Sequence, residues 1–187
     1  ATKSITQSLN SLLAESDISD AILNAFQAAH KELTSYKNDN SLSKIGTTLI
    51  CLIFKNENVY IGHVGDSRTY LYQENTLKQI TTDHNIKTLV ANKQLDPKYL
   101  EKSNPNALVK ALGTKEATPD VYISPVKPRQ IYLTATDGLF NMLSDFEITN
   151  IISANLTNLE LLPDILINEA KKKGGHDNIT VLTASTI

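Results

Sequence analysis

Residues 46 to 81 read GTTLICLIFKNENVYIGHVGDSRTYLYQENTLKQIT. The run at 46–54 is β-branched and apolar, and it is too short and too apolar for a helix on a protein surface. Polar turns follow at 55–58 and at Glu74 and Asn75, so that strands are predicted at 46–54, 59–64, 69–72 and 77–81. Four strands in sequence predict an antiparallel meander.

Helical patterns lie on both sides of this stretch. Apolar residues recur at three-and-four spacing before it, which predicts a pair of amphipathic helices. The first helix has Ile5, Leu9, Leu12 and Leu13, and the second has Ile18, Ile22, Ala25, Phe26, Ala29 and Leu33. After it, a capping box of Ser144 and Glu147 begins one helix, and a second is predicted at 159–172 with Gly174 as its stop. Further strands are predicted at 121–124, 131–135 and 179–182.

The order of these elements predicts an α+β fold, in which two antiparallel β-sheets pack together and helices cover the outer faces. A single domain is expected over residues 1–187. Its parts are a helical pair at 1–36, a strand meander at 46–82, an irregular flap-like insertion at 83–106, and a second set of strands and helices at 107–187.

Composition excludes several classes of protein. Eighteen basic and twenty acidic side chains give a net charge of −2 and form no basic stripe, which argues against a nucleic-acid partner. The longest apolar run, at 49–54, is far too short to cross a membrane, and no signal segment is seen. The single cysteine, Cys51, is expected to be buried, which agrees with a reducing, cytoplasmic compartment.

Three aspartates each stand at an end of a predicted strand and beside a chain reversal. They are Asp66 in VGDSR, Asp137 in TDG and Asp177 in GHDN. Strand ends in a sandwich meet at one rim, so these carboxylates are expected to converge there, and Mg²⁺ and Mn²⁺ prefer such oxygen ligands. The alternative is that each aspartate only caps its own turn.

Seven short motifs occur in an order that resembles the metal-dependent protein serine/threonine phosphatases of the type 2C class, in their bacterial style. They read GTT at 46–48, GHVGDSR at 62–68, TDH at 82–84, ALG at 111–113, PD at 119–120, TDGL at 136–139 and DNIT at 177–180. The resemblance covers roughly residues 42–187. It implies the αββα sandwich of that family and hydrolysis of phosphoserine or phosphothreonine in proteins.

The resemblance also implies roles for particular residues. Asp137 and Asp177 would bind two Mn²⁺ or Mg²⁺ ions, and Asp66 with Asp137 would hold a weaker third ion. Gly138 and Asn178 would support these loops, and Arg68 would pair with an aspartate of the site or contact phosphate. The two ions would share a water, lower its pKa and direct it at phosphorus.

Other polar side chains invite a catalytic interpretation. Ser67 lacks the sequence of a nucleophile elbow, and His63 lies inside a strand, where a core histidine is the commoner role. His176 replaces a position that varies in the family, whereas His84 begins the flap-like insertion and is the candidate for substrate binding. The expected partners are a phosphorylated protein and a protein kinase or its target.

One departure from the family concerns the N-terminus. Relatives begin with a strand that carries an acidic pair after an arginine and then a strand that ends in an Asp-Gly turn, and neither is found here. We therefore expect catalysis only when this segment is present, so that the chain alone is inactive or weakly active. The alternative is a catalytically inactive regulatory or phosphoprotein-binding module.

Overall fold

The computed structural model describes residues 17–186. The helix predicted around Ile5 to Leu13 lies outside the described residues. These residues divide into two compact units, one from 17–66 and 83–125 and the other from 67–82 and 126–186. Among the residues described, no helix has the length and apolar character needed to cross a membrane.

The first unit contains a three-stranded antiparallel sheet. Its strands are β1 (Leu49–Lys55), β2 (Asn58–Val64) and β5 (Asp120–Pro125), in the order β1-β2-β5. A two-residue turn joins β1 to β2, and its residues Asn56 and Glu57 have φ of 51° and 61°. Positive φ at both positions is the geometry that suits the twist of a hairpin. In the order β1-β2-β5, β2 is the central strand.

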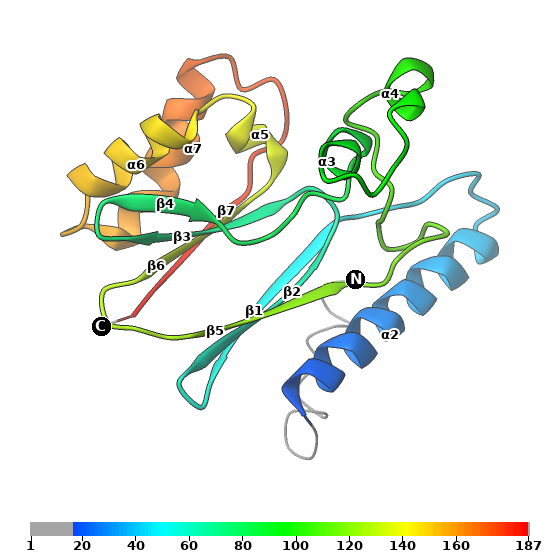
Figure 1. Cartoon of the computed structure of the whole chain (residues 1–187), viewed down its shortest axis with the longest axis horizontal. Coiled ribbons are helices and arrows are strands. Elements are labelled where there is room, and N and C mark those ends of the chain that lie inside the picture. The colour runs from blue at the N-terminus through cyan, green and yellow to red at the C-terminus, as the bar shows by residue number, and fades with distance from the viewer. Residues whose placement is uncertain (1–16, 187) are drawn as a thin grey trace. The chain divides into compact units, whose positions relative to one another are not determined.

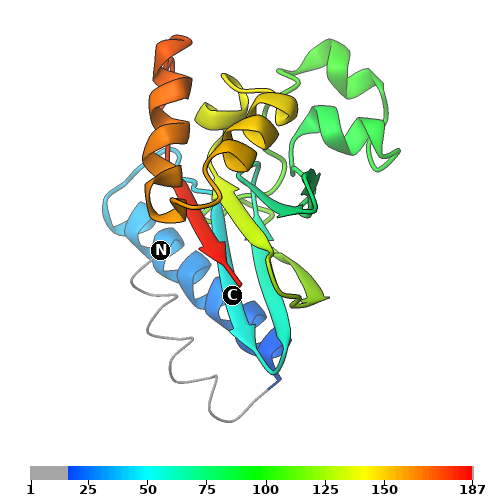
Figure 2. The same cartoon turned by 90° about the vertical axis from the view of Figure 1, so that its left-hand side faces the viewer.

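Helix α2 (Ile18–Asp39) packs against this sheet (Figures 1 and 2). Asp17 caps it by accepting a hydrogen bond from the backbone N–H of Ser19 at 2.7 Å. Its buried face consists of Ile18, Ala21, Ile22, Ala25, Phe26 and Ala29. The helix crosses β2 at Gly62, where a Cβ would lie 2.5 Å from Cγ2 of Ile22. The predicted amphipathic helix is thus confirmed and extends six residues beyond Leu33.

The predicted insertion contains two short helices, α3 (Ile86–Ala91) and α4 (Lys98–Lys102). Asn85 caps α3, because its side chain accepts from the backbone N–H of Thr88 at 2.9 Å. A β-bridge between Asn85 and Leu108 closes the base of this segment. This bridge ties the start of the insertion to its end.

The second unit contains a four-stranded antiparallel sheet with helices. Its strands are β3 (Arg68–Gln73), β4 (Thr76–Gln79), β6 (Ile131–Ala135) and β7 (Val181–Ser185), in the order β4-β3-β6-β7. The helices are α5 (Asp137–Phe140), α6 (Asp145–Ala154), the 3-10 turn η1 (Leu159–Leu161) and α7 (Leu162–Lys172). One apolar core joins Tyr70 and Leu133 of the sheet to Ile148 of α6 and Leu166 of α7.

The expectation of two antiparallel sheets with helices is confirmed, but the single four-stranded meander is wrong. β2 pairs with β1 and β5, whereas β3 pairs with β4 and β6. Gly65, at φ 114°, begins the connection from β2 to β3. The intervening residues look like a hairpin turn in sequence, yet the strands on either side belong to different sheets.

Local signals in the second unit are more reliable. The capping box is present, with Ser144 and the side chain of Glu147 bonding each other's backbone. The chain leaves α7 through Gly174 at φ 130°, a conformation that favours glycine. The short helix α5, which the sequence did not predict, begins at Asp137.

Candidate metal centre

Asp137 lies where β6 ends and α5 begins. β6 ends at Ala135, and Thr136 follows with the extended conformation of an N-cap, at φ −77° and ψ 164°. Asp137 is then the first helical residue, a position at which a carboxylate suits the helix dipole. The side chain is partly buried. Local sequence therefore fixes this aspartate at the end of a central strand.

Asp177 lies on the loop that connects α7 to β7. Gly174 and Gly175, at φ 130° and 55°, reverse the chain before it. Its Oδ1 accepts a hydrogen bond from the backbone N–H of Asn178 at 2.7 Å, which holds the carboxylate against its own turn. The side chain is exposed.

The pairing of β6 with β7 brings these two loops together. The N–H of Thr136 donates to the carbonyl oxygen of Thr180 at 3.1 Å, and the N–H of Thr180 donates to Oγ1 of Thr136 at 3.0 Å. Oγ1 of Thr136 in turn donates to the carbonyl oxygen of Asn178 at 3.2 Å. Asp137 and Asp177 thus stand on adjoining loops at one end of the sheet.

Asp66 belongs to the first unit. It follows Gly65, where a Cβ would lie 2.3 Å from Cγ2 of Thr48 and where φ is 114°. The carbonyl oxygen of Gly65 accepts from the backbone N–H of His84 at 2.8 Å. The turn that carries Asp66 is therefore closed on one side by Thr48 and on the other by His84.

The donor chemistry at Asp137 and Asp177 fits a hard divalent cation. Carboxylate oxygens are the ligands that Mg²⁺ and Mn²⁺ prefer, with water filling the remaining positions. Within residues 17–186, neither carboxylate forms an ion pair that would compete with a cation. No group of three or more His, Cys, Asp or Glu side chains that could hold an ion occurs among those residues.

Arg68 is oriented by aromatic neighbours in the second unit. Its Nη1 donates to the hydroxyl of Tyr70 at 3.2 Å, and its guanidinium carbon lies 5.1 Å from the ring centroid of Phe140. The Tyr70 hydroxyl donates to Asp145 at 3.0 Å. Burial raises the pKa of Tyr70 to about 12, so this hydroxyl stays protonated at neutral pH. Either predicted role of Arg68 remains a prediction.

The other candidates differ in exposure. His63 and His84 are buried, with ring centroids 4.6 Å apart, and Ser67 is 7% exposed. His176 is exposed. Buried side chains of this kind contact protein rather than substrate, which favours structural roles for His63 and Ser67.

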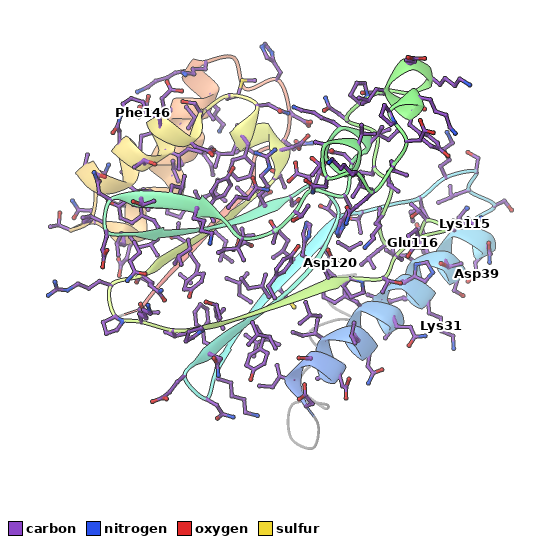
Figure 3. The ribbon with its side chains drawn as sticks, viewed as in Figure 1. Lys31, Asp39, Lys115, Glu116, Asp120 and Phe146 are labelled. Carbon is purple, nitrogen blue, oxygen red and sulfur yellow. The ribbon has the colours of Figure 1, made fainter. Side chains whose placement is uncertain are left out.

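The partners of His84 could not be predicted from the sequence. Nε2 of His84 lies 3.1 Å from Oδ2 of Asp120, and Nζ of Lys110 lies 3.0 Å from the other oxygen, Oδ1. Figure 3 labels Asp120 at the start of β5. Partial burial opposes ionisation of Asp120, but the hydrogen bonds from His84 and Lys110 outweigh it and hold the pKa of the carboxyl below its usual range. The aspartate of the PD motif was the only signal in the sequence.

Each unit also has a cavity lined by its own residues. One of about 430 Å³ lies between α2 and residues 115–119, beside the labelled Lys115 and Glu116 (Figure 3). The other, of about 560 Å³, is lined by Gln130, Ile131 and Ser185. These residues lie at the opposite end of β6 and β7 from Asp137, so this cavity is separate from the candidate metal ligands.

Comparison with known proteins agrees with the fold and motifs. The model of the family Protein phosphatase 2C matches residues 2–89. The serine/threonine phosphatase stp of Listeria welshimeri is 33% identical over 175 residues, which cover 91% of this chain and 69% of the relative.

Solved structures give the same result. The serine/threonine phosphatase of S. agalactiae superposes with a TM-score of 0.82 at 25% identity and covers 98% of this chain and 79% of its own. The catalytic domain of the phosphatase PstP, in complex with two manganese ions, gives a TM-score of 0.79 at 26% identity, with the same coverage of both chains.

This chain belongs to the protein phosphatase 2C family of metal-dependent serine/threonine phosphatases. The predicted family is thus confirmed, together with its fold and its class of reaction. Its homologues imply phosphoprotein substrates.

Proposed function

We propose that Asp137 and Asp177 bind two divalent cations, Mn²⁺ or Mg²⁺, and that Asp66 with Asp137 holds a weaker third ion. The observation that carries this proposal is the hydrogen bonding of Thr136 to Asn178 and Thr180, which sets two carboxylates on adjoining loops. PstP in complex with two manganese ions supports the choice of metal.

The reaction is the hydrolysis of a phosphoserine or phosphothreonine ester. When bound, the ions would lower the pKa of a water and offset the charge of the phosphate oxygens. The backbone of Asp137 is held by the first turn of α5, and the carboxylate of Asp177 accepts from the backbone N–H of Asn178, so that the loops carrying both carboxylates are in place before an ion arrives. Such preorganisation favours binding, because less conformational freedom is lost.

Two carboxylates supply too little negative charge to hold two divalent ions tightly. Each absent carboxylate removes charge that offsets the cost of dehydrating a divalent cation. We propose that full activity needs the N-terminal segment that the family resemblance predicts, with its acidic pair and Asp-Gly turn, and that residues 1–187 alone turn over weakly or not at all.

The substrate is proposed to be a phosphorylated protein, and the reaction to oppose a protein kinase in the cytoplasm. The segment containing α3 and α4 is proposed as a flap that selects the substrate. Tyr99 and Leu100 of α4 are 43% and 39% exposed, whereas the charge of Lys98 beside them is paired with Asp96 at 3.0 Å. Such a surface suits a phosphopeptide that carries an apolar residue near the phosphorylated one.

A second candidate function is a module that binds phosphoproteins without turnover. It is favoured by the finding that, in the described part of the chain, no three potential ligands form a metal-binding group. Under this alternative, the flap and the loops of Asp137 and Asp177 would bind a phosphoprotein, and Mn²⁺ would make no difference to it.

The test is phosphate release from a phosphothreonine peptide and from an aryl phosphate, with and without Mn²⁺. It compares the 187-residue chain with a form extended upstream by its natural sequence. We expect Asp137→Asn and Asp177→Asn to lower the Mn²⁺-dependent rate at least about 100-fold. Changes to residues that only support a metal ligand already lower activity by up to about 100-fold, and loss of the ligand itself should cost no less.

Asp164→Asn, an exposed carboxylate in the first turn of α7, is the matched control and should keep the rate. Activity in the extended form alone would support the need for the N-terminal segment. No Mn²⁺-dependent turnover in either form, together with retained binding of the phosphopeptide, would overturn the enzyme proposal in favour of the binding module.

A further inference from the structure

His84 has both of its ring nitrogens engaged inside the first unit. The imidazole is 2% exposed. Nδ1 lies 3.0 Å from the backbone nitrogen of Gly65, which can only donate, so Nδ1 is the unprotonated nitrogen. Nε2 therefore carries the hydrogen and donates it to Asp120 at 3.1 Å. A side chain bound in this way has no free nitrogen to offer a substrate.

The contact with Gly65 is two-sided. The side chain of His84 accepts from the N–H of Gly65, while the backbone N–H of His84 donates to the carbonyl oxygen of Gly65 at 2.8 Å. Both polar backbone groups of one glycine are thus satisfied by one histidine. Because Gly65 immediately precedes Asp66, this pair of bonds fixes the backbone that leads into Asp66.

A second layer orients the imidazole. Oδ2 of Asp120 accepts from Nε2 of His84, and Oδ1 is held by Lys110 at 3.0 Å. The carbonyl oxygen of His84 also accepts from the N–H of Val109 at 2.8 Å. A carboxylate behind a histidine selects the tautomer and fixes the ring orientation, as it does behind metal-bound histidines.

We propose that His84 is a positioning residue for Asp66, through a chain of contacts from Lys110 to Asp120, then to His84 and Gly65. The proposal rests on the proposed function, in which Asp66 is a metal ligand. This positioning role of His84 differs from the substrate binding that the sequence predicted for it. His84 would act by presenting the Asp66 carboxylate to the weakest-binding of the three ions.

Two substitutions separate the roles of the two ring nitrogens. In His84→Asn, the amide oxygen can replace Nδ1 as acceptor for Gly65 but cannot reach Asp120. In His84→Gln, the amide nitrogen can replace Nε2 as donor to Asp120 but leaves Gly65 without its acceptor. If the contact with Gly65 matters for Asp66, the glutamine variant must be the worse of the two.

The experiment is a titration with Mn²⁺ alone, with free Mn²⁺ followed by electron paramagnetic resonance, on the form of the protein that binds the metal. We expect His84→Gln to weaken the weakest binding step roughly tenfold or more, and His84→Asn to weaken it less. In an Asp66→Asn background, His84→Gln should have no further effect, because the ligand that it positions is already lost.

Thermal unfolding without metal gives the readout for a merely structural role. Asp120→Asn and Lys110→Met change side chains that are 37% and 26% exposed, so they keep the test available if changes at His84 prevent folding. Both should weaken the same binding step, less than His84→Gln does, and neither should do so in the Asp66→Asn background.

Two results overturn the proposal and can be told apart. If Asp66→Asn leaves Mn²⁺ binding unchanged, Asp66 is not a ligand, and both its proposed role and the role of His84 fall. If Asp66→Asn weakens binding but His84→Gln adds an equal loss in both backgrounds, Asp66 remains a ligand while the positioning role is refuted.

Discussion

Gly138 lies directly against the carbonyl oxygen of Asn178: a Cβ at position 138 would come within 2.4 Å of that oxygen. Only a residue without a side chain allows the loop of Asp137 to approach the loop of Asp177 this closely. The glycine of the TDG motif therefore has a packing role that can be separated from any contact with metal. It sets the spacing of the two loops.

The first prediction follows from this contact. Gly138→Ala should lower the free energy of unfolding by about 1–3 kcal/mol, as overpacking does, and should weaken Mn²⁺ binding because the loops are forced apart. Urea unfolding and calorimetric titration with Mn²⁺ measure the two effects. Gly46→Ala is the control, since the shortest contact of its Cβ would be 3.2 Å, to a methyl group of Thr114. Equal losses in both variants would contradict the account.

The second prediction concerns the contact of α2 with β2. A Cβ at Gly62 would lie 2.5 Å from Cγ2 of Ile22 and 2.9 Å from Cε2 of Phe26. Gly62→Ala should therefore destabilise the protein by about 1–3 kcal/mol. Ile22→Ala alone should cost about 2–5 kcal/mol, as other large-to-small core changes do. The double variant should be more stable than the sum predicts, because removing the Ile22 side chain makes room; strict additivity in urea unfolding would be evidence against this packing.

The third prediction concerns pH. Glu147 interacts with Lys173 and bonds the backbone and side chain of Ser144, and these contacts lower the pKa of Glu147 to about 2. A depressed pKa in the folded state means that the stabilisation is present at pH values above the ordinary value of 4.5. It is lost as the pH falls from there towards 2, where the folded state is also protonated.

Glu147→Gln removes the charge and keeps an acceptor for the capping box. The wild type should unfold at a higher urea concentration than this variant at neutral pH, and the difference should shrink below about pH 4.5 and with added salt. Glu160→Gln, in η1, is the control. A difference between the wild type and Glu147→Gln that stays constant from pH 7 to pH 2 would show that the charge of Glu147 does not stabilise α6.

Much of the fold could be predicted from sequence because its signals are local. The capping box of Ser144 and Glu147, the glycine after α7 and the buried stripe of α2 each act within a few residues. The partition of strands between sheets could not be predicted in this way. It depends on which distant strands, β5 and β6, pair with β2 and β3.

The candidate site likewise has a part that could be predicted from the sequence and a part that could not. Motif order was enough to name Asp137 and Asp177 as candidates, since Asp137 follows β6 and Asp177 precedes β7. The link from His84 to Asp120 joins residues 36 positions apart, and no periodicity or turn rule relates them. Its function could be inferred only once the ring nitrogens of His84 and their partners were located.

The most direct test of the central claim is crystallography of the protein soaked with Mn²⁺, with anomalous scattering used to locate the metal. We predict a strong anomalous peak within coordination distance of both the Asp137 and the Asp177 carboxylates, and its disappearance in Asp137→Asn. Anomalous peaks only at other carboxylates, or a peak at this site that persists unchanged in Asp137→Asn, would contradict the claim.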